Sequence, residues 1–259
     1  MIVEPKREIL LGPLVRAGVR RSWAARDHFL RLAVVPLIAI LAILVPLQRV
    51  MFDAVTDARA ASMPEGGGPV GQVALLGICY AAVLNIFAVN WLRQLTLGTS
   101  AAPNLGLSLS ARHFRFFLLI MSTSIGSGIV GVIFMLFLSS LGMAGILAAL
   151  MASLLIWVAV IVRISPSWIG IALDAPMRLG TAWRRTSGQG FKLLIALLAV
   201  EVPLMFLQQL VGGIFEASGL IALAPLTFVL FTAVVQLVGT AIQLAILVTA
   251  FPYFLRETV

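Results

Sequence analysis

The side chain with the clearest chemical potential is a single carboxylate, Glu201, inside the apolar run LLIALLAVEVPLMFLQQLVGG. The run begins at Leu193 and ends at Gly213, and Pro203 follows the carboxylate by two residues. A charge near the centre of a membrane costs at least ~2.5 kcal/mol, and a buried carboxyl group needs hydrogen-bond partners in either protonation state. Because proline has no N–H, Pro203 also frees the carbonyl of Ala199 as an acceptor.

Side chains that could pair with Glu201 recur in the same run and in the last apolar run. Gln208 is seven residues further on and therefore shares nearly the same helix face. The last run carries Thr and Gln side chains at steps of four and three residues: Thr232, Gln236, Thr240 and Gln243. We expect Glu201, Gln208, Gln236, Thr240 and Gln243 to form a polar seam between two helices, with Thr240 at about the depth of Glu201.

Two interpretations of this seam are open. It is either interhelical glue, in which each hydrogen bond is worth ~0.6–2 kcal/mol, or a path for a substrate or a proton. Transporters usually carry several intramembrane ionisable groups or broken helices, whereas this chain has one such group and one proline beside it. The composition of the seam therefore favours glue.

Other motifs fit structural roles better than chemical ones. The pattern Gly126-x-Gly128-x-x-Gly131 in IGSGIVG matches a dinucleotide-binding loop, but that loop must follow a strand. Here the pattern lies inside an apolar run, where small residues four apart favour close helix packing. The two histidines, His28 and His113, lack the neighbouring ligands that a metal site needs and are expected at the membrane interface.

The sequence also lacks the common arrangements of an enzyme. Cys79 is the single cysteine and lies in an apolar run, so it reads as a small buried hydrophobe. No Ser-His-Asp set, HExxH or P-loop motif is present. We therefore predict no catalytic, cofactor-binding or metal-binding residue, and no enzymatic activity.

Composition places the chain in a membrane. Of its 259 residues, 61% are hydrophobic and only 11% are charged, whereas a soluble domain needs about 25% charged residues to cover its surface. A spanning helix takes about 20 apolar residues. Six runs qualify, roughly Leu30–Leu47, Val70–Leu92, Phe116–Ser139, Leu141–Val162, Leu193–Gly213 and Leu220–Phe251.

The basic residues predict the orientation. With the N-terminus in the cytoplasm and alternating spans, 16 of the 18 Lys and Arg residues face the cytoplasm, and only Arg49 and Arg59 lie outside. This positive-inside bias places both termini in the cytoplasm. It also assigns the net charge of +8 to membrane-surface anchoring rather than to nucleic acid. The predicted organisation is a cytoplasmic basic amphipathic segment over 1–29, a six-span domain over 30–255 and a cytoplasmic tail over 256–259.

Two cytoplasmic segments are predicted to form amphipathic helices. In GPLVRAGVRRSWAARDHF, the apolar residues Leu11, Val15, Val19 and Trp23 recur every four residues, which suits a helix lying on the membrane or docked on the protein. In VRISPSWIGIALDAPMRLGTAWRRTSGQGFK, Asp174 can cap a second helix with Pro176 in its first turn. Gly188 and Gly190 would end that helix. The expected contacts with anionic phospholipid headgroups are Arg16, Arg20, Arg21, Arg178, Arg184 and Arg185.

Several local patterns together resemble a known class. They are NWLRQLTLG at the end of the second span, VRISPSW at the end of the fourth, a segment from Ala182 to Phe191 that reads AW-basic-x-T-x-G-x-G-F, and the C-terminal FPYFLRE. This set resembles uncharacterised bacterial six-span membrane proteins that are similar to the membrane domain of membrane-anchored glycerophosphoryl diester phosphodiesterases. The resemblance implies a six-span architecture. It supplies no catalytic residue, because the soluble catalytic domain of those enzymes has no counterpart in this sequence.

The sequence therefore predicts an all-α polytopic membrane protein, a six-helix transmembrane bundle with amphipathic interfacial helices. Its expected location is a bacterial inner membrane, and its expected role is that of a scaffold, assembly factor or accessory subunit without enzymatic activity. Its expected partners are the lipid bilayer, anionic phospholipids, and another membrane protein or a second copy of itself. The alternative is a small permease or lipid-handling transporter that uses Glu201.

Overall fold

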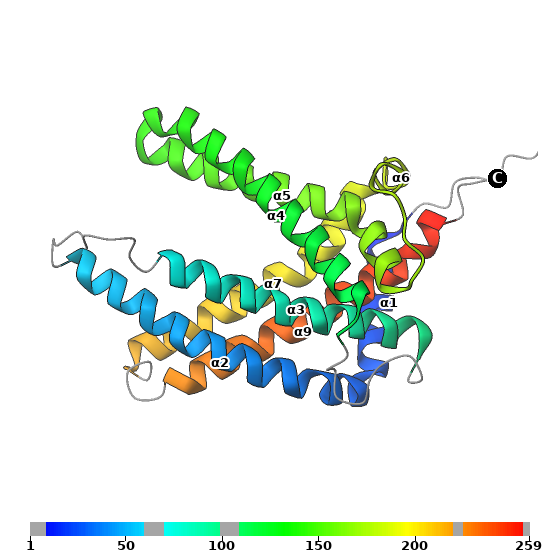
Figure 1. Cartoon of the computed structure of the whole chain (residues 1–259), viewed down its shortest axis with the longest axis horizontal. Coiled ribbons are helices and arrows are strands. Elements are labelled where there is room, and N and C mark those ends of the chain that lie inside the picture. The colour runs from blue at the N-terminus through cyan, green and yellow to red at the C-terminus, as the bar shows by residue number, and fades with distance from the viewer. Residues whose placement is uncertain (1–8, 60–69, 99–108, 220–224, 256–259) are drawn as a thin grey trace, which may run out of the picture. The chain divides into compact units, whose positions relative to one another are not determined.

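The computed structural model describes residues 9–59, 70–98, 109–219 and 225–255, and over these residues the chain is helical without strands (Figure 1). The elements are α1 (Leu11–Ala24), α2 (Arg26–Arg59), α3 (Val70–Leu97), α4 (Ala111–Leu138), the 3-10 turn η2 (Ser139–Leu141), α5 (Gly142–Ala172), α6 (Leu179–Arg185), α7 (Gly190–Ala217) and α9 (Pro225–Leu255). The predicted all-α class is confirmed for the described residues.

Five stretches of the described chain are long and apolar enough to cross a membrane. They are Arg26–Gln48, Gly71–Leu97, Ala111–Ala172, Gly190–Ala217 and Pro225–Leu255. The third stretch contains two helices, α4 and α5, which η2 joins. These stretches are compatible with the predicted multi-pass membrane protein. The start of the predicted sixth span, Leu220, lies outside the described residues.

Contacts group the helices into two compact units. The first unit holds α1, α4, α5 and α6, together with α7 up to Ala199 and α9 from Gln243. The second unit holds α2 and α3, together with α7 from Val200 and α9 up to Ile242. Two long helices therefore contribute to both units, and each unit is described by itself below.

In the first unit, α4 and α5 form an antiparallel hairpin (Figure 1). Near its open end, the rings of Phe116 and Trp168 lie 6.2 Å apart between centroids. In its middle, a Cβ on Gly131 would stand 3.0 Å from Ser153 Oγ, so this glycine lets the two helices approach closely. The glycine pattern of IGSGIVG thus lies within a helix, and Gly131 alone of its three glycines packs on the facing helix, since nothing lies within 4 Å of a Cβ on Gly126 or Gly128.

The helix α5 continues well past the predicted end of the fourth span at Val162, through Pro166 to Ala172. Proline removes the N–H that would bond the carbonyl four residues earlier, which is that of Val162. The hydroxyl of Ser165 donates to this carbonyl at 2.8 Å and so satisfies the freed acceptor. The helix therefore extends beyond the predicted end of the fourth span, because a neighbouring serine allows it to pass the proline, and the residues around the proline are buried.

The helix α1 docks on the first unit through a face that the sequence did not predict. Leu14 and Gly18 are buried, and a Cβ on Gly18 would stand 2.5 Å from Ile246 Cγ1 and 2.9 Å from its Cα. The N–H of Ile9 donates to Gln189 Oε1 at 3.3 Å. The spacing of apolar side chains could not predict this docking face, because the residue at its centre is a glycine. Gly18 contributes by letting the backbone of α1 approach α9 closely, and not by an apolar side chain.

In the second unit, α9 lies between α3 and α7. The indole N–H of Trp91 on α3 donates to the carbonyl of Ala241 on α9 at 2.9 Å. On another side of α9, Leu204 of α7 packs over Gly239. The helix α2 joins α3 through Phe29, whose ring meets the Trp91 ring edge-on at 5.6 Å.

The glycine contact under α1 gives a test of its docking. Gly18→Ala should destabilise the protein by ~1–3 kcal/mol, because the new methyl group meets Cγ1 of Ile246 and also the backbone of this residue, which cannot move aside as a side-chain end can. The melting temperature in detergent and the hydrogen exchange of α1 would measure the effect. Gly12→Ala is the matched control on the same helix. Nothing lies within 4 Å of its Cβ position, so it should be neutral or stabilise by up to ~1 kcal/mol. Equal effects of the two variants would contradict the docking.

Candidate functional site

The predicted polar seam corresponds to the interface of α7 and α9 in the second unit. Leu204 Cδ1 lies 2.8 Å from where a Cβ of Gly239 would stand, and the Phe215 and Phe228 rings are 5.7 Å apart. On α7, Glu201 and Gln208 lie three residues before and four residues after Leu204, and so share its face. These contacts therefore turn the two polar side chains of α7 toward α9.

The facing surface of α9 carries polar side chains at the same spacing. Gln236 and Thr232 precede Gly239 by three and seven residues and lie on its face. The two helices run antiparallel, and Leu204 lies opposite Gly239. Four residues further along α7, Gln208 is therefore level with Val235 of α9, which is next to Gln236. The interface therefore places two amide side chains at one depth.

The same contact gives the register at Glu201. Counted from the same contact, Glu201 is level with Ile242 rather than with Thr240. The hydroxyl of Thr240 donates to the carbonyl of Gln236 on its own helix at 2.8 Å. Gln243, the last predicted member of the seam, belongs to the first unit. Thr240 therefore lies two residues, or about 3 Å of helix rise, from the level of Glu201.

The chemistry available in this interface is hydrogen bonding between closely packed helices. Glu201, Gln208 and Gln236 are half-buried, and Leu204, between the two polar positions along α7, packs on Gly239 of α9. Within the described residues, no group of three or more His, Cys, Asp or Glu side chains could hold a metal ion. The buried hydroxyl of Thr232 has no hydrogen-bond partner among the side chains and backbone around it.

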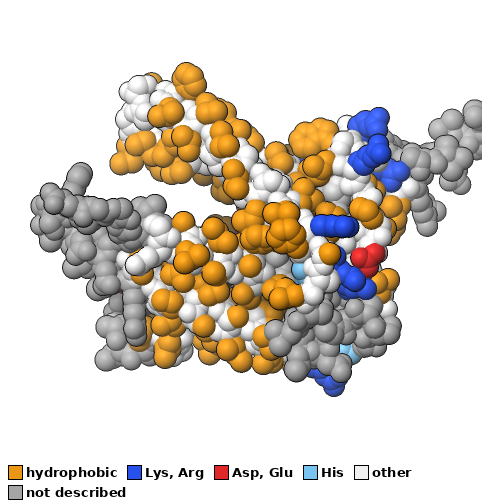
Figure 2. Space-filling view, in the orientation of Figure 1, with side chains coloured by type: hydrophobic (Ala, Val, Ile, Leu, Met, Phe, Trp, Pro, Cys, Tyr) orange, Lys and Arg blue, Asp and Glu red, His pale blue; other side chains and the backbone are white. Residues whose placement is uncertain are grey.

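A second polar region lies at the open end of the α4–α5 hairpin in the first unit. The described residues of this unit carry ten Lys and Arg side chains and one acidic side chain, Asp174. In Figure 2 blue side chains gather beside α6, whereas the hairpin beyond carries hydrophobic side chains. We call this region the basic end. It consists of α1, the start of α4, the last turns of α5, α6 and the start of α7.

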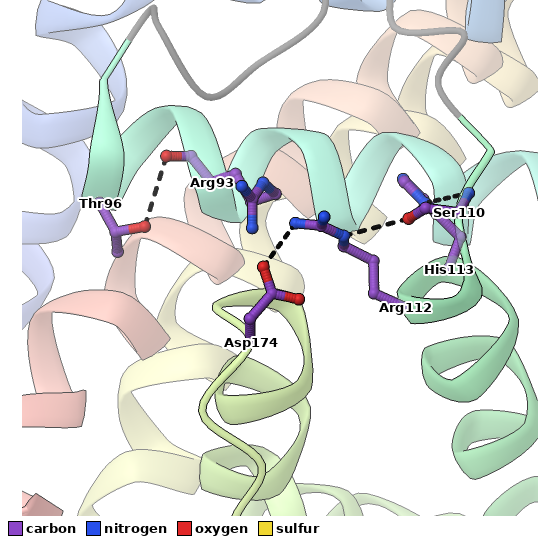
Figure 3. A network of polar contacts seen from close by, with 6 residues as sticks. All are labelled: Arg93, Thr96, Ser110, Arg112, His113 and Asp174. Atoms are coloured by element: carbon purple, nitrogen blue, oxygen red, sulfur yellow. Dashed lines mark hydrogen bonds and ion pairs between the residues drawn. The ribbon is translucent and has the colours of Figure 1, made fainter.

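A small network fixes the start of α4 within the basic end (Figure 3). The backbone N–H of Ser110 donates to His113 Nδ1 at 3.2 Å, and the Ser110 hydroxyl lies 2.9 Å from the same nitrogen. Because Nδ1 accepts from a backbone N–H, this serine–histidine pair is a reciprocal helix cap. His113 is only 4% exposed, so the protein itself covers this side chain at the start of α4.

The loop after α5 is held to the start of α4 by an ion pair. Arg112 bonds Asp174 Oδ2 through its NH1 at 2.7 Å and donates from Nε to the Ser110 hydroxyl at 3.0 Å (Figure 3). Asp174 has a φ of 59°, in the left-handed region. Its predicted role as a helix cap was wrong, because α6 begins only at Leu179, with Arg178 at the N-cap position.

The side chain of Arg163 holds α6 in place. Its guanidinium lies 5.0 Å from the centre of the Trp183 ring, and its NH1 donates to the Trp183 carbonyl at 3.3 Å. The hydroxyl of the buried Thr186 lies 3.1 Å from the Arg163 carbonyl. A Cβ on Gly190 would stand 3.4 Å from Arg163 Cδ, so the start of α7 also packs against this side chain.

The six arginines predicted to contact headgroups divide into two groups. Arg16, Arg20, Arg178 and Arg184 are exposed, whereas Arg21 and Arg185 are half-buried. Burial lowers the pKa of the Arg21 guanidinium. The structure therefore presents four of the six side chains to the surroundings.

Sequence reasoning missed the residues that position the basic end. Arg163 and Gly18 act through close contacts with segments far away in the chain, which no local pattern records. A local signal did exist for Ser165, because it directly precedes Pro166 and a serine there can reach the carbonyl that the proline frees.

Comparison with protein-family models, with curated protein sequences and with solved structures found no match to this chain.

The contacts of Arg163 predict that α6 loosens when this side chain is shortened. Arg163→Gln removes the cation–π contact, which is worth ~0.5–1 kcal/mol at an exposed site and corresponds to about two- to fivefold more local opening. Trypsin cleavage at Arg184 and Arg185 should rise by this factor in the detergent-solubilised protein. Arg163→Lys keeps a cation near the ring and should give a smaller increase. Unchanged cleavage in Arg163→Gln would show that α6 is held by its other contacts.

Proposed function

We propose that the chain is a six-span integral membrane protein in which α4 and α5 each cross the bilayer. These helices have 28 and 31 residues, or about 42 and 46 Å at 1.5 Å per residue, which exceeds the ~30 Å hydrocarbon core. The turn η2 between them contains no charged residue, so nothing in it opposes transfer across the membrane. The resemblance to bacterial six-span proteins supports the same number of spans.

The proposed location is a bacterial inner membrane with both termini in the cytoplasm. The basic end of the first unit supports this orientation, because it gathers ten basic side chains where α4 begins and α5 ends. Such a cluster is retained on the cytoplasmic side, where anionic lipids attract it. The predicted division into 1–29, 30–255 and 256–259 follows from the same orientation.

The proposed role is that of a scaffold, assembly factor or accessory subunit without catalytic activity. The observation that carries it is the packing of Leu204 against Gly239 between Glu201 and Gln208. A substrate path needs a cavity between these polar side chains, whereas a packed interface supports the use of the seam as interhelical glue. The proposed partner is another membrane protein or a second copy of this chain.

One observation supports the alternative, a permease or lipid-handling transporter. Glu201 is half-buried in the middle of α7, and Pro203 lies inside this helix two residues later. A proline frees a backbone carbonyl and permits a kink, which are features of the broken helices of transporters. In this role Glu201 would exchange a proton or bind a cationic group.

Reporter fusions test the number of spans and their direction. Fusions after Ser62 and Leu141 should read periplasmic, and fusions after Pro103, Thr181 and Val259 should read cytoplasmic. Alkaline phosphatase and fluorescent-protein fusions at each position provide the paired measurement. A cytoplasmic signal after Leu141 would remove the separate crossings of α4 and α5. A periplasmic signal after Thr181 would contradict the whole orientation.

Substitutions at Glu201 decide between the scaffold and the transporter. Gln matches a neutral Glu in size and hydrogen-bonding capacity but cannot take up or release a proton. In a scaffold, Glu201→Gln should keep both the melting temperature in detergent and the ability to complement a deletion strain. Glu201→Leu should lower stability by ~0.6–2 kcal/mol for each hydrogen bond that it removes.

The matched control for these variants is Gln208→Leu, which removes a polar side chain from the same face of α7 but no ionisable group. If the seam is glue, Gln208→Leu and Glu201→Leu should destabilise the protein to a similar extent. A stable but inactive Glu201→Gln protein would overturn the scaffold role and support the transporter.

A further inference from the structure

The helix α1 has an outward face opposite to the face that docks on α9. Val19 and Trp23 are 41% and 69% exposed, although both belong to the apolar stripe of this helix. Arg16 and Arg20 are exposed beside them. At 100° per residue, these four side chains occupy an arc of about 100°, whereas the position of Gly18 lies about 100° or more away from all four of them. One strip of α1 therefore presents apolar and cationic groups together.

The helix α6 presents the same combination in the same unit. Its buried residue, Ala182, packs inward, and the neighbouring Trp183 is 43% exposed. Arg184, which follows this tryptophan, and Arg178, at the N-cap of the helix, are also exposed. Because Arg163 contacts the Trp183 ring and carbonyl, the exposed indole is held in one place rather than left to collapse on the protein.

An exposed indole next to guanidinium groups suits the headgroup layer of a membrane. Tryptophan prefers this layer because its ring is apolar and its N–H is polar, and arginine pairs with phosphate oxygens through two parallel hydrogen bonds. The charge balance of the unit, ten basic side chains to one acidic, favours a partner that carries negative charge over an extended area. The leaflet beside the apolar helices of this unit provides such an area if it contains anionic lipid.

We infer that α1 and α6 form a binding surface for anionic phospholipid headgroups, in which Arg16, Arg20, Arg178 and Arg184 contact phosphate. Trp23 and Trp183 lie beside these cations at the depth of the glycerol backbone. Arg21 and Arg185 are excluded from this surface, because they are half-buried in the unit. The inference rests on the proposed membrane embedding of the chain and is independent of its proposed scaffold role.

The test is lipid binding by the full-length protein purified in mild detergent. Native mass spectrometry with added phosphatidylglycerol or phosphatidylcholine measures the preference for the anionic lipid. The quadruple variant R16Q/R20Q/R178Q/R184Q should lose about tenfold or more of this preference, since each basic residue near an anionic surface is worth ~1 kcal/mol, or about fivefold. The variant R16K/R20K/R178K/R184K keeps the charges and should retain most of it.

Further arms separate this result from other causes. R21Q/R185Q removes two charges of the same unit and should leave the preference within about twofold. Trp23→Ala should weaken binding of both lipids alike, because it removes an uncharged contact. Inorganic phosphate at millimolar concentration should not displace bound phosphatidylglycerol. Displacement by phosphate would assign the surface to a soluble phosphate compound.

An unchanged preference in the quadruple variant would overturn the inference, and an acidic protein partner would then be the occupant that the charges require. A loss in the glutamine variant together with an equal loss in the lysine variant would also overturn it, because charge would not be the cause. Extraction of membranes with alkaline carbonate tests the proposed embedding separately. Release of the wild-type protein by this treatment would contradict the embedding, whatever the lipid result.

Discussion

The constraint on which the rest of the structure depends is the scarcity of charge. With 11% charged residues, the chain cannot cover its helices with water-facing side chains, so each backbone polar group along them must find a partner inside the protein. An α-helix pairs its backbone N–H and C=O groups within itself. Where a proline leaves a carbonyl unpaired, a nearby side chain must donate to it. Pro166 removes one hydrogen bond from α5, and Ser165 replaces it with a side-chain hydroxyl at 2.8 Å. The same constraint explains why Ser122, Thr123 and Ser153 all donate to carbonyls of their own helices.

Close helix approach follows from small residues placed at a few positions. Leu204 of α7 packs against Gly239 of α9, and Ser153 packs against Gly131 within the α4–α5 hairpin. Ile246 of α9 packs against Gly18 of α1. In lipid, helix association gains little from burying apolar surface, so packing at such contacts and a limited number of hydrogen bonds must supply it. In the proposed scaffold, a polar seam would stabilise such an interface through its hydrogen bonds.

The charges that the chain does have are distributed unequally. By sequence, the described part of the second unit contains five basic and five acidic residues, whereas that of the first unit contains ten and one. The one acidic side chain, Asp174, is paired with Arg112 at 2.7 Å, and Arg163 is directed to Trp183. The exposed arginines of α1 and α6 are left facing outward, which is the arrangement expected of a surface that meets anionic headgroups.

The sequence by itself determined the helical class, the apolar stretches and the clustering of arginines, because hydropathy over about 20 residues and charge position are local properties. It also located Glu201, Gln208 and Gln236 on faces that the structure turns toward one another, since helical spacing is fixed by geometry. Only the tertiary structure decided their depth, the burial of His113, the ion pair that occupies Asp174 and the face by which α1 docks. Each of these depends on which distant segment packs against a helix. The sequence pattern around Gly18, or around the capping pair Ser110 and His113, does not indicate which segment that is.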